Sequence, residues 1–242
     1  MTRQRKDSAA SRPHRFRVTA VEQPAPHLTL LRVEPVEGGA FDFRAGQYAR
    51  VGFDGLRARN LSIACAPGGA TLEFLIRDRP HHAGNLFSWL KIGAMAEIEG
   101  PFGRGYLRED HAGPILAAAG GSGIAPIKSI VETALKKGMS QPIHFYFGVR
   151  DEPDLYLESH FEELARKYRN LRFVPVLSEA ANPRARRTGL VGEAVAADLP
   201  QLAGFKAYVF GPPAMVKSTA ATVRALGVAA EDIHTDEEEN VT

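Results

Sequence analysis

The most constraining feature of this sequence is a glycine-rich turn between a short apolar run and an amphipathic pattern. Residues 114–119 are apolar, and Gly120-Gly121-Ser122-Gly123 follows them directly. In residues 126–137 the apolar side chains recur at the spacing of one helix face, at Ile127, Ile130, Val131, Ala134 and Leu135. A strand, a tight glycine turn and the positive end of a helix together make a candidate pyrophosphate site.

The turn by itself does not specify a ligand. The dinucleotide fingerprint G-x-G-x-x-G has Pro126 at its third glycine position here. An ordinary tight connection between a strand and a helix accounts for the same residues equally well. The pyrophosphate site is therefore a hypothesis that depends on the rest of the chain.

The second half of the chain alternates between the two periodicities. We predict strands at residues 143–149, 171–177, 206–210 and 232–235, and helices at residues 154–168, 193–198 and 213–226. Strands that alternate with helices favour a parallel sheet with helices on both faces.

The first half has a different pattern. Short runs rich in strand formers are separated by Gly, Pro and Asp, at residues 16–20, 28–33, 47–53, 60–65 and 71–77, with one short helix predicted near residues 84–91. This spacing is typical of an antiparallel barrel or sandwich. The predicted organisation is β + α/β: a disordered basic tail at 1–13, a β-barrel domain at 14–110, and a Rossmann-like parallel-sheet domain at 111–242.

Composition excludes several classes of protein. The 242 residues hold 30 Lys and Arg against 28 Asp and Glu, which argues against a nucleic-acid-binding protein. The single cysteine, Cys65, can form no internal disulfide, zinc-thiolate site or iron–sulfur cluster. It fits a reducing compartment, and we expect the cytoplasm. The apolar stretch at residues 113–127 is shorter than the roughly 20 residues of a membrane span, and no apolar segment of a secretory signal follows the basic N-terminus.

A metal site is not expected either. His81 and His82 are adjacent, so their side chains point apart, and no carboxylate or thiol is spaced to join them. The basic N-terminal residues and the acidic last twelve residues are interpreted as solvated tails in preference to docking segments.

Five motifs occur in one order along the chain: Arg59-Asn60-Leu61-Ser62, Gly100-Pro101-Phe102-Gly103, the turn beginning at Gly120, Phe147-Gly148-Val149-Arg150 with Asp154-Leu155-Tyr156, and Gly211-Pro212-Pro213-Ala214-Met215. From about residue 14 the chain resembles the ferredoxin–NADP reductase superfamily. The resemblance implies an FAD-binding barrel, an NAD(P)-binding domain, and hydride transfer from nicotinamide C4 to flavin N5. It also implies an external electron acceptor: a ferredoxin, an oxygenase component, a haem protein or free flavin.

The resemblance assigns roles to individual residues. It places Arg59 at the FAD phosphates and Ser62 near flavin N5, where the alternatives are a surface ion pair and a strand-edge hydroxyl. Cofactor-binding positions on the flavin side are Arg59, Asn60, Leu61, Ser62, Ile76, Arg77, Gly84, Asn85, Leu86 and Ser88. On the nicotinamide side they are Gly121, Ser122, Gly123, Arg150, Ser178, Gly211, Pro212, Pro213 and Met215.

The sequence departs from the family pattern at three places. Leu61 stands where the family has a tyrosine against the flavin. Phe210 replaces a cysteine, which predicts restricted nicotinamide access, or else a plain core residue. No aromatic residue follows Phe210, although many relatives end with one that covers the flavin.

The nucleotide preference depends on the residues after the second and third predicted strands of the second half. Glu152 and Glu179 are acidic, and carboxylates favour the free ribose hydroxyls of NADH over the 2′-phosphate of NADPH. Arg184, Arg186 and Arg187 could reverse this preference by folding over a phosphate; a solvated loop or docking of an acidic redox partner are the other interpretations. We therefore expect NADH, with NADPH possible.

Two other functions remain open at this level. The chain could be a flavin reductase that uses flavin as a substrate, because the tyrosine and the terminal aromatic are both replaced. It could also be a nonenzymatic nucleotide-sensing module that kept the fold and lost turnover.

Overall fold

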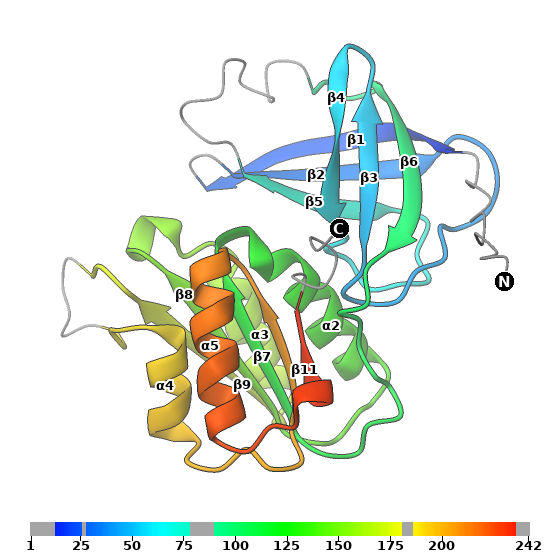
Figure 1. The fold of residues 1–242 in the computed structure, drawn as a ribbon. Coiled ribbons are helices and arrows are strands. Elements are labelled where there is room, and N and C mark those ends of the chain that lie inside the picture. Colours follow the sequence, from blue (N-terminus) through cyan, green and yellow to red (C-terminus); the bar gives the residue numbers. More distant parts are fainter. Residues whose placement is uncertain (1–12, 26–27, 78–89, 181–185, 236–242) are drawn as a thin grey trace, which may run out of the picture.

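The structure is a computed structural model, and it describes residues 13–25, 28–77, 90–180 and 186–235. Its strands form two sheets, one above the other in Figure 1. This arrangement confirms the predicted β + α/β fold class. The domain boundaries at residues 14, 110 and 111 stay predictions.

The first sheet is antiparallel and has six strands in the order β4-β3-β6-β1-β2-β5. The strands are β1 (His14–Ala25), β2 (Leu28–Pro35), β3 (Tyr48–Phe53), β4 (Leu56–Ser62), β5 (Leu72–Arg77) and β6 (Met95–Phe102). A bridge between Ile63 and Phe74 joins the ends of the two edge strands, which closes the sheet toward a barrel. Alternate side chains fill its interior, among them Phe16, Val33 and Val51.

The second sheet is parallel, with strand order β11-β10-β7-β8-β9. Its strands are β7 (Ile115–Gly120), β8 (Ile143–Val149), β9 (Leu171–Leu177), β10 (Lys206–Phe210) and β11 (Ile233–His234). Its helices are α2 (Ile124–Lys136), α3 (Glu158–Lys167), α4 (Val191–Asp198) and α5 (Pro213–Ala225), with 3₁₀ turns η1 (Gly121–Gly123), η2 (Glu152–Asp154) and η3 (Ala230–Asp232). From β7 the chain adds β8 and β9 on one side of the sheet and then β10 and β11 on the other. The strand order therefore reverses at β7, and parallel sheets of this kind bind ligands at the carboxyl ends of the strands beside such a reversal.

The helices cover both faces of this sheet. Helices α2 and α3 pack on the face that carries Phe145 and Phe147, and α4 and α5 pack on the opposite face with Tyr146 and Val209 (Figure 1). Helix α2 also contacts the antiparallel sheet, because Leu30 and Leu75 of that sheet share one apolar cluster with the parallel sheet and α2. The two sheets therefore meet across α2.

The structure corrects one predicted helix. Residues 154–168 were expected to form a single helix, but the chain makes the short turn η2, and Leu157 then adopts a left-handed conformation with φ 60° before α3 begins. Pro153 lies within the first turn of η2, where its missing N–H costs nothing. The predicted helix near residues 84–91 lies almost entirely outside the described residues.

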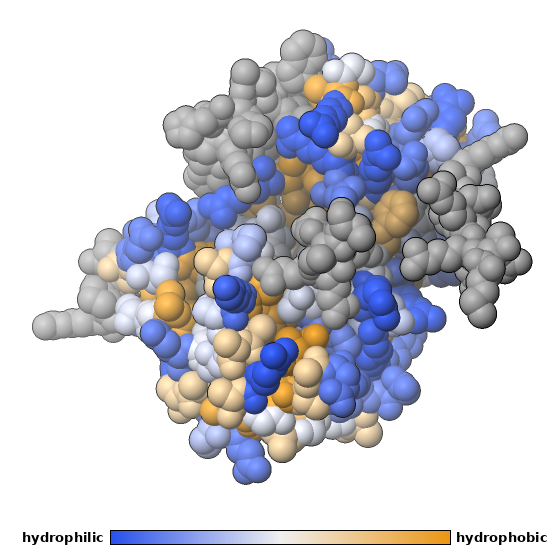
Figure 2. All heavy atoms as spheres, viewed as in Figure 1, coloured by the Kyte–Doolittle hydropathy of each residue, from blue (hydrophilic) through white to orange (hydrophobic). Residues whose placement is uncertain are grey.

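Hydrophilic residues cover much of the face shown in Figure 2, and hydrophobic residues are interspersed among them. In the described ranges the exposed large apolar side chains are Ile92, Phe102 and Leu190. Within the same ranges, no helix has the length and hydropathy of a membrane span.

Candidate functional site

The carboxyl ends of β7 and β10 approach so closely that the turn between β7 and α2 needs glycine. A Cβ atom on Gly123 would overlap the carbonyl group of Phe210, and one on Gly120 would overlap the Met215 sulfur. Gly211 has a φ of +152° and lies against Gly120. The glycines at these positions therefore allow two strand ends and the start of α5 to meet around one open turn.

The N-terminus of α2 faces this turn without a side-chain cap. Its N-cap residue, Gly123, has no side chain to accept a hydrogen bond, and its first turn holds no acidic residue. The backbone N–H of Ile124, the first residue of the helix, donates to the carbonyl oxygens of Gly121 and Ser122. Ser122 is exposed, whereas Gly121 and Gly123 are buried. The positive end of a helix without a side-chain cap fits the pyrophosphate of a dinucleotide.

Three side chains from other segments surround the turn. The Tyr156 hydroxyl donates a hydrogen bond to the carbonyl oxygen of Gly121, and burial raises the pKa of Tyr156 above its usual value, so the hydroxyl keeps its proton. Arg77 at the end of β5 forms an ion pair with Asp154, with 3.4 Å between Nη2 and Oδ1. Its Nη1 atom lies 2.8 Å from where a Cβ on Gly121 would be. The sequence assigned Arg77 to the flavin segment. The structure brings it to the turn of Gly120 to Gly123, which we call the dinucleotide turn after its proposed ligand.

A second face lies across β4, β3 and β6. Tyr48 is paired with Ser62 on one side and with Phe102 on the other, and paired residues in an antiparallel sheet point to the same face. The rings of Tyr48 and Phe102 are 5.7 Å apart, and Phe102 is 40% exposed. Sequence reasoning missed Tyr48. Tyr48 lies on β3, which pairs with the strand that carries Ser62. The sequence alone does not show this proximity, because it depends on the strand pairing.

The motif at residues 59–62 is divided between two faces. Asn60 and Ser62 share the face of Tyr48, whereas Leu61 pairs with Ala49 and packs partly buried against the interior of the barrel. Arg59 is exposed and forms no ion pair with any described residue. The flavin roles of these four residues stay predictions, and the Tyr48 ring supplies an aromatic surface that Leu61 lacks.

The aromatic face beside Ser62 fits a flavin. A flat ring packs favourably on accessible aromatic side chains, and half-buried Tyr48 and exposed Phe102 provide two of them. The exposed guanidinium of Arg59 suits a phosphate, and alternation along β4 puts it on the side of Leu61, opposite that of Ser62. Of the second flavin segment, buried Ile76 and exposed Arg77 end β5, whereas Gly84, Asn85, Leu86 and Ser88 lie outside the described residues.

Phe210 is a core residue. It is fully buried and lies against Gly105, where a Cβ would come within 2.9 Å of its ring. Its burial supports the alternative of a strand residue in the core, and the restriction of the nicotinamide by its ring stays a prediction. Pro212 and Pro213, by contrast, are exposed at the start of α5, next to half-buried Met215.

The ends of β8 and β9 carry paired charges. Arg150 lies 3.8 Å from Glu179, and both side chains are mostly exposed. The backbone N–H of Ser178 donates to the carbonyl of Val149, which holds the two strand ends together. Among the described residues, no group of three or more His, Cys, Asp or Glu side chains is arranged to hold a metal ion.

The fold and these two faces define a two-part oxidoreductase with a dinucleotide turn at the switch point of its parallel sheet. Residues 118–221 match the family model of the oxidoreductase NAD-binding domain. A protein of Ralstonia sp, the ferredoxin–NAD(P)(+) reductase component of naphthalene 1,2-dioxygenase/salicylate 5-hydroxylase systems, is 42% identical over 221 residues, which are 90% of this chain and 67% of that protein.

Solved structures agree with this similarity. An Amycolatopsis cytochrome P450 reductase has a TM-score of 0.85 at 33% identity, covering 93% of this chain and 69% of the other. A ferredoxin NADP+ reductase of Neisseria gonorrhoeae with bound FAD and NADP has a TM-score of 0.78 at 24% identity, covers 93% and 98%, and supports the fold alone.

The chain belongs to the ferredoxin–NADP reductase superfamily. It is an NAD(P)H-dependent oxidoreductase of the FAD-binding type. It spans about two thirds of the length of the curated relatives that it matches.

Proposed function

We propose that this chain is the reductase of an oxygenase system, which passes electrons from NADH to a ferredoxin or directly to the oxygenase component. The observation that carries the proposal is the contact between the antiparallel sheet and the turn of Gly120 to Gly123. Arg77 ends a barrel strand and lies over the dinucleotide turn. The relatives named as reductase components of oxygenase systems support the class of acceptor.

The residues of the chain have separate tasks in this proposal. Bound FAD accepts two electrons together and releases them singly, which connects NADH to one-electron carriers. Ser62 offers a hydroxyl beside the aromatic pair of Tyr48 and Phe102, and Arg59 offers a cation for the phosphates. The uncapped N–H groups after Gly121 bind the pyrophosphate of the nucleotide.

The charges near β8 and β9 favour NADH. Arg186 is paired with Glu158 and lies 3.7 Å from Glu152, and Arg187 is paired with Asp198 at 2.6 Å. Two of the three arginines that could have bound a 2′-phosphate are thus neutralised by carboxylates, while Arg184 lies outside the described residues. Glu179 remains 68% exposed, where its carboxylate can accept hydrogen bonds from ribose hydroxyls.

We further propose a cytoplasmic location. The nucleotide is a cytoplasmic reductant, and the single cysteine needs no oxidising compartment. Expression with a reporter fused to either end and fractionation of the cells tests this location.

An anaerobic visible spectrum tests the proposed function. The purified protein should show flavin bands that bleach with NADH at lower concentration than with NADPH. A purified [2Fe–2S] ferredoxin added next should restore the oxidised bands. Bands that never bleach would contradict the proposal. A colourless protein that oxidises NADH only with added FAD or FMN would identify a flavin reductase instead.

A further inference from the structure

Helix α2 connects the two faces through its second turn. Ser129 Oγ donates a hydrogen bond to the carbonyl oxygen of Cys65 at 2.6 Å, and Lys128 Nζ donates to that of Ala64 at 3.2 Å. Ala64 and Cys65 come two and three residues after Ser62, where β4 ends. The same helix starts at the dinucleotide turn. One rigid element therefore contacts both halves of the candidate site.

The lysine in this contact has no freedom to move. Its side chain is 11% exposed, and Nζ lies 2.9 Å from Glu73 and 3.1 Å from Glu132. Burial acts to lower the pKa of Lys128, but the two carboxylates outweigh it and raise the pKa above its usual value. The ammonium group has three donors, and Ala64, Glu73 and Glu132 take all three.

The strand end is held from its other side as well. The backbone N–H of Ile63 donates to the carbonyl of Gln47 at 3.0 Å, and that of Ala64 donates to the carbonyl of Glu73 at 2.7 Å. Ser129 and Ala64 are both fully buried. The segment after Ser62 is thus fixed to the barrel by its N–H groups and to α2 by its carbonyl groups.

The path between the two faces is short. From Gly123 to Ser129 the helix rises about 9 Å, and three residues from Ser62 to Cys65 span at most about 11 Å. A misplacement of about 1 Å between reacting groups can cost on the order of 100-fold in rate. The side chains that join these two segments therefore control a distance on which the reaction depends.

We propose that Lys128 and Ser129 are positioning residues, which hold Ser62 at a set place relative to the turn of Gly121 to Gly123. This inference rests on the proposed function. Neither side chain touches the exposed faces, so removing Ser129 Oγ leaves Ser62 and the glycine turn chemically unchanged. The purely structural alternative is that the two residues only stabilise the interface.

Ser129→Ala tests the proposal against Thr133→Val. Thr133 lies one turn further along α2, is 2% exposed, and donates to the carbonyl of Ser129 at 2.6 Å, so its bond stays within the helix. Both variants lose one buried hydroxyl group. Amide hydrogen exchange of residues 62–66 in the cofactor-free protein should become about tenfold faster in Ser129→Ala and stay unchanged in Thr133→Val.

The second measurement is the rate of flavin bleaching by NADH under anaerobic conditions. Ser129→Ala should lower the limiting rate about tenfold without changing the NADH concentration for half-maximal rate, whereas Thr133→Val keeps both. Lys128→Met should act like Ser129→Ala, and Lys128→Arg should restore part of the rate. Ser129→Ala and Lys128→Met rates equal to that of Thr133→Val would overturn the inference. Failure of the proposed function is distinguishable, because the wild-type protein itself would then not bleach.

Discussion

At the scale of single residues, strand pairing decides which side chains work together. The four residues of Arg59 to Ser62 are consecutive, yet alternation along β4 sends Leu61 into the barrel and Ser62 to the outer face. Tyr48 and Phe102 join Ser62 there from two other strands. The aromatic surface is thus supplied from neighbouring strands and not from the motif itself.

Ser62→Ala should slow flavin reduction by NADH about fivefold and leave the flavin content unchanged, because one hydrogen bond of roughly 1 kcal/mol is lost. Stopped-flow absorbance measures the rate, and the spectrum of the purified protein measures the content. Ser140→Ala is the matched control, since it removes an exposed hydroxyl group outside both faces and should leave the rate unchanged. An unchanged rate in Ser62→Ala would remove the role assigned to its hydroxyl.

Glu179→Arg should shift the preference toward NADPH by about tenfold or more, because an exposed carboxylate is replaced by a bidentate phosphate donor. The ratio of kcat/KM for the two nucleotides measures the shift. Glu163→Arg makes the same charge change on an exposed position of α3 and should leave the ratio near that of the wild type. Equal ratios in both variants would mean that Glu179 does not face the ribose.

At the scale of elements, the turn after β7 combines tight packing with an open helix end. Its glycines are needed because the Phe210 carbonyl and the Met215 sulfur occupy the space of a side chain. The same closeness keeps the N–H groups of α2 free of side-chain caps. Close packing and the proposed ligand binding therefore both favour glycine in this turn.

Gly123→Ala should destabilise the protein by about 1–3 kcal/mol, because the added methyl group forces the β10 backbone to shift. It should also weaken NADH binding. Urea unfolding and nucleotide titration measure the two effects. Gly39→Ala, where a Cβ meets no atom within 4 Å, should change neither by a comparable amount. Wild-type stability in Gly123→Ala would show that the turn has more room than the structure gives it.

Strand β11 carries a histidine that resists protonation. Burial, with the nearby charges of Arg108 and Lys206, lowers the pKa of His234 to about 4. Its ring packs 5.1 Å from that of Tyr208, and its buried Nε2 has no hydrogen-bond partner within the described part of the chain. The neutral ring is thus the form that the fold accepts.

The resulting pH dependence has a definite sign. The unfolded chain binds a proton at the ordinary histidine pKa of about 6.5 and the folded chain does not, so stability is lost as pH falls from about 6.5 to about 4. His234→Phe keeps an aromatic ring at this position. The urea midpoint of this variant should depend less on pH across this range than that of the wild type. His144, whose pKa burial also lowers, should keep part of the slope. A variant profile parallel to that of the wild type would contradict this assignment.

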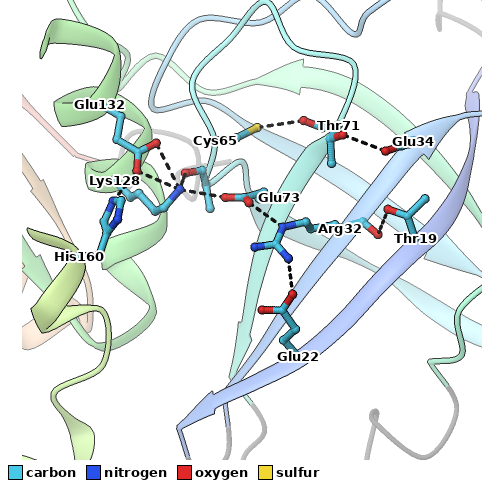
Figure 3. A network of polar contacts seen from close by, with 11 residues as sticks. Thr19, Glu22, Arg32, Glu34, Cys65, Thr71, Glu73, Lys128, Glu132 and His160 are labelled. Carbon is cyan, nitrogen blue, oxygen red and sulfur yellow. Dashed lines mark hydrogen bonds and ion pairs between the residues drawn. The ribbon is translucent and has the colours of Figure 1, made fainter. Parts of the chain in front are cut away.

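At the scale of the whole molecule, a chain of charges joins the two sheets. Arg32 of the barrel pairs with Glu73 at 2.9 Å, and Glu73 pairs with Lys128 of α2 at the same distance (Figure 3). Burial would raise the pKa of Glu73, but Lys128 and Arg32 outweigh it and hold the pKa below its usual value. The carboxylate therefore stays charged between two cations at the contact between the halves.

Glu73→Gln should cost about 2–3 kcal/mol, slightly less than the roughly 3–5 kcal/mol of breaking a fully buried pair, because solvent reaches part of this site. Urea unfolding followed by circular dichroism measures the loss. Glu99→Gln removes an exposed carboxylate 3.6 Å from Arg50 and should change stability by less than about 1 kcal/mol. Equal effects of the two variants would mean that the interface pair adds nothing to stability.

The sequence by itself determined the class of fold and the location of the glycine turn between β7 and α2. Strands β8, β9 and β10 begin and end at the predicted residues, and the predicted α2 lies within one or two residues of the observed helix. These features are local, because apolar periodicity and glycine turns act over a few residues. The order of five motifs was enough to indicate the superfamily.

Only the tertiary structure decided which distant residues meet. Arg77 and Asp154 are 77 positions apart, and Ser129 contacts Cys65 across 64 positions. The pairing of Tyr48 with Ser62 and Phe102 depends on strand register, and the neutralisation of Arg186 and Arg187 depends on helices packed elsewhere. Such contacts follow from the packing of the whole chain, because register and long-range ion pairs have no signature in local composition.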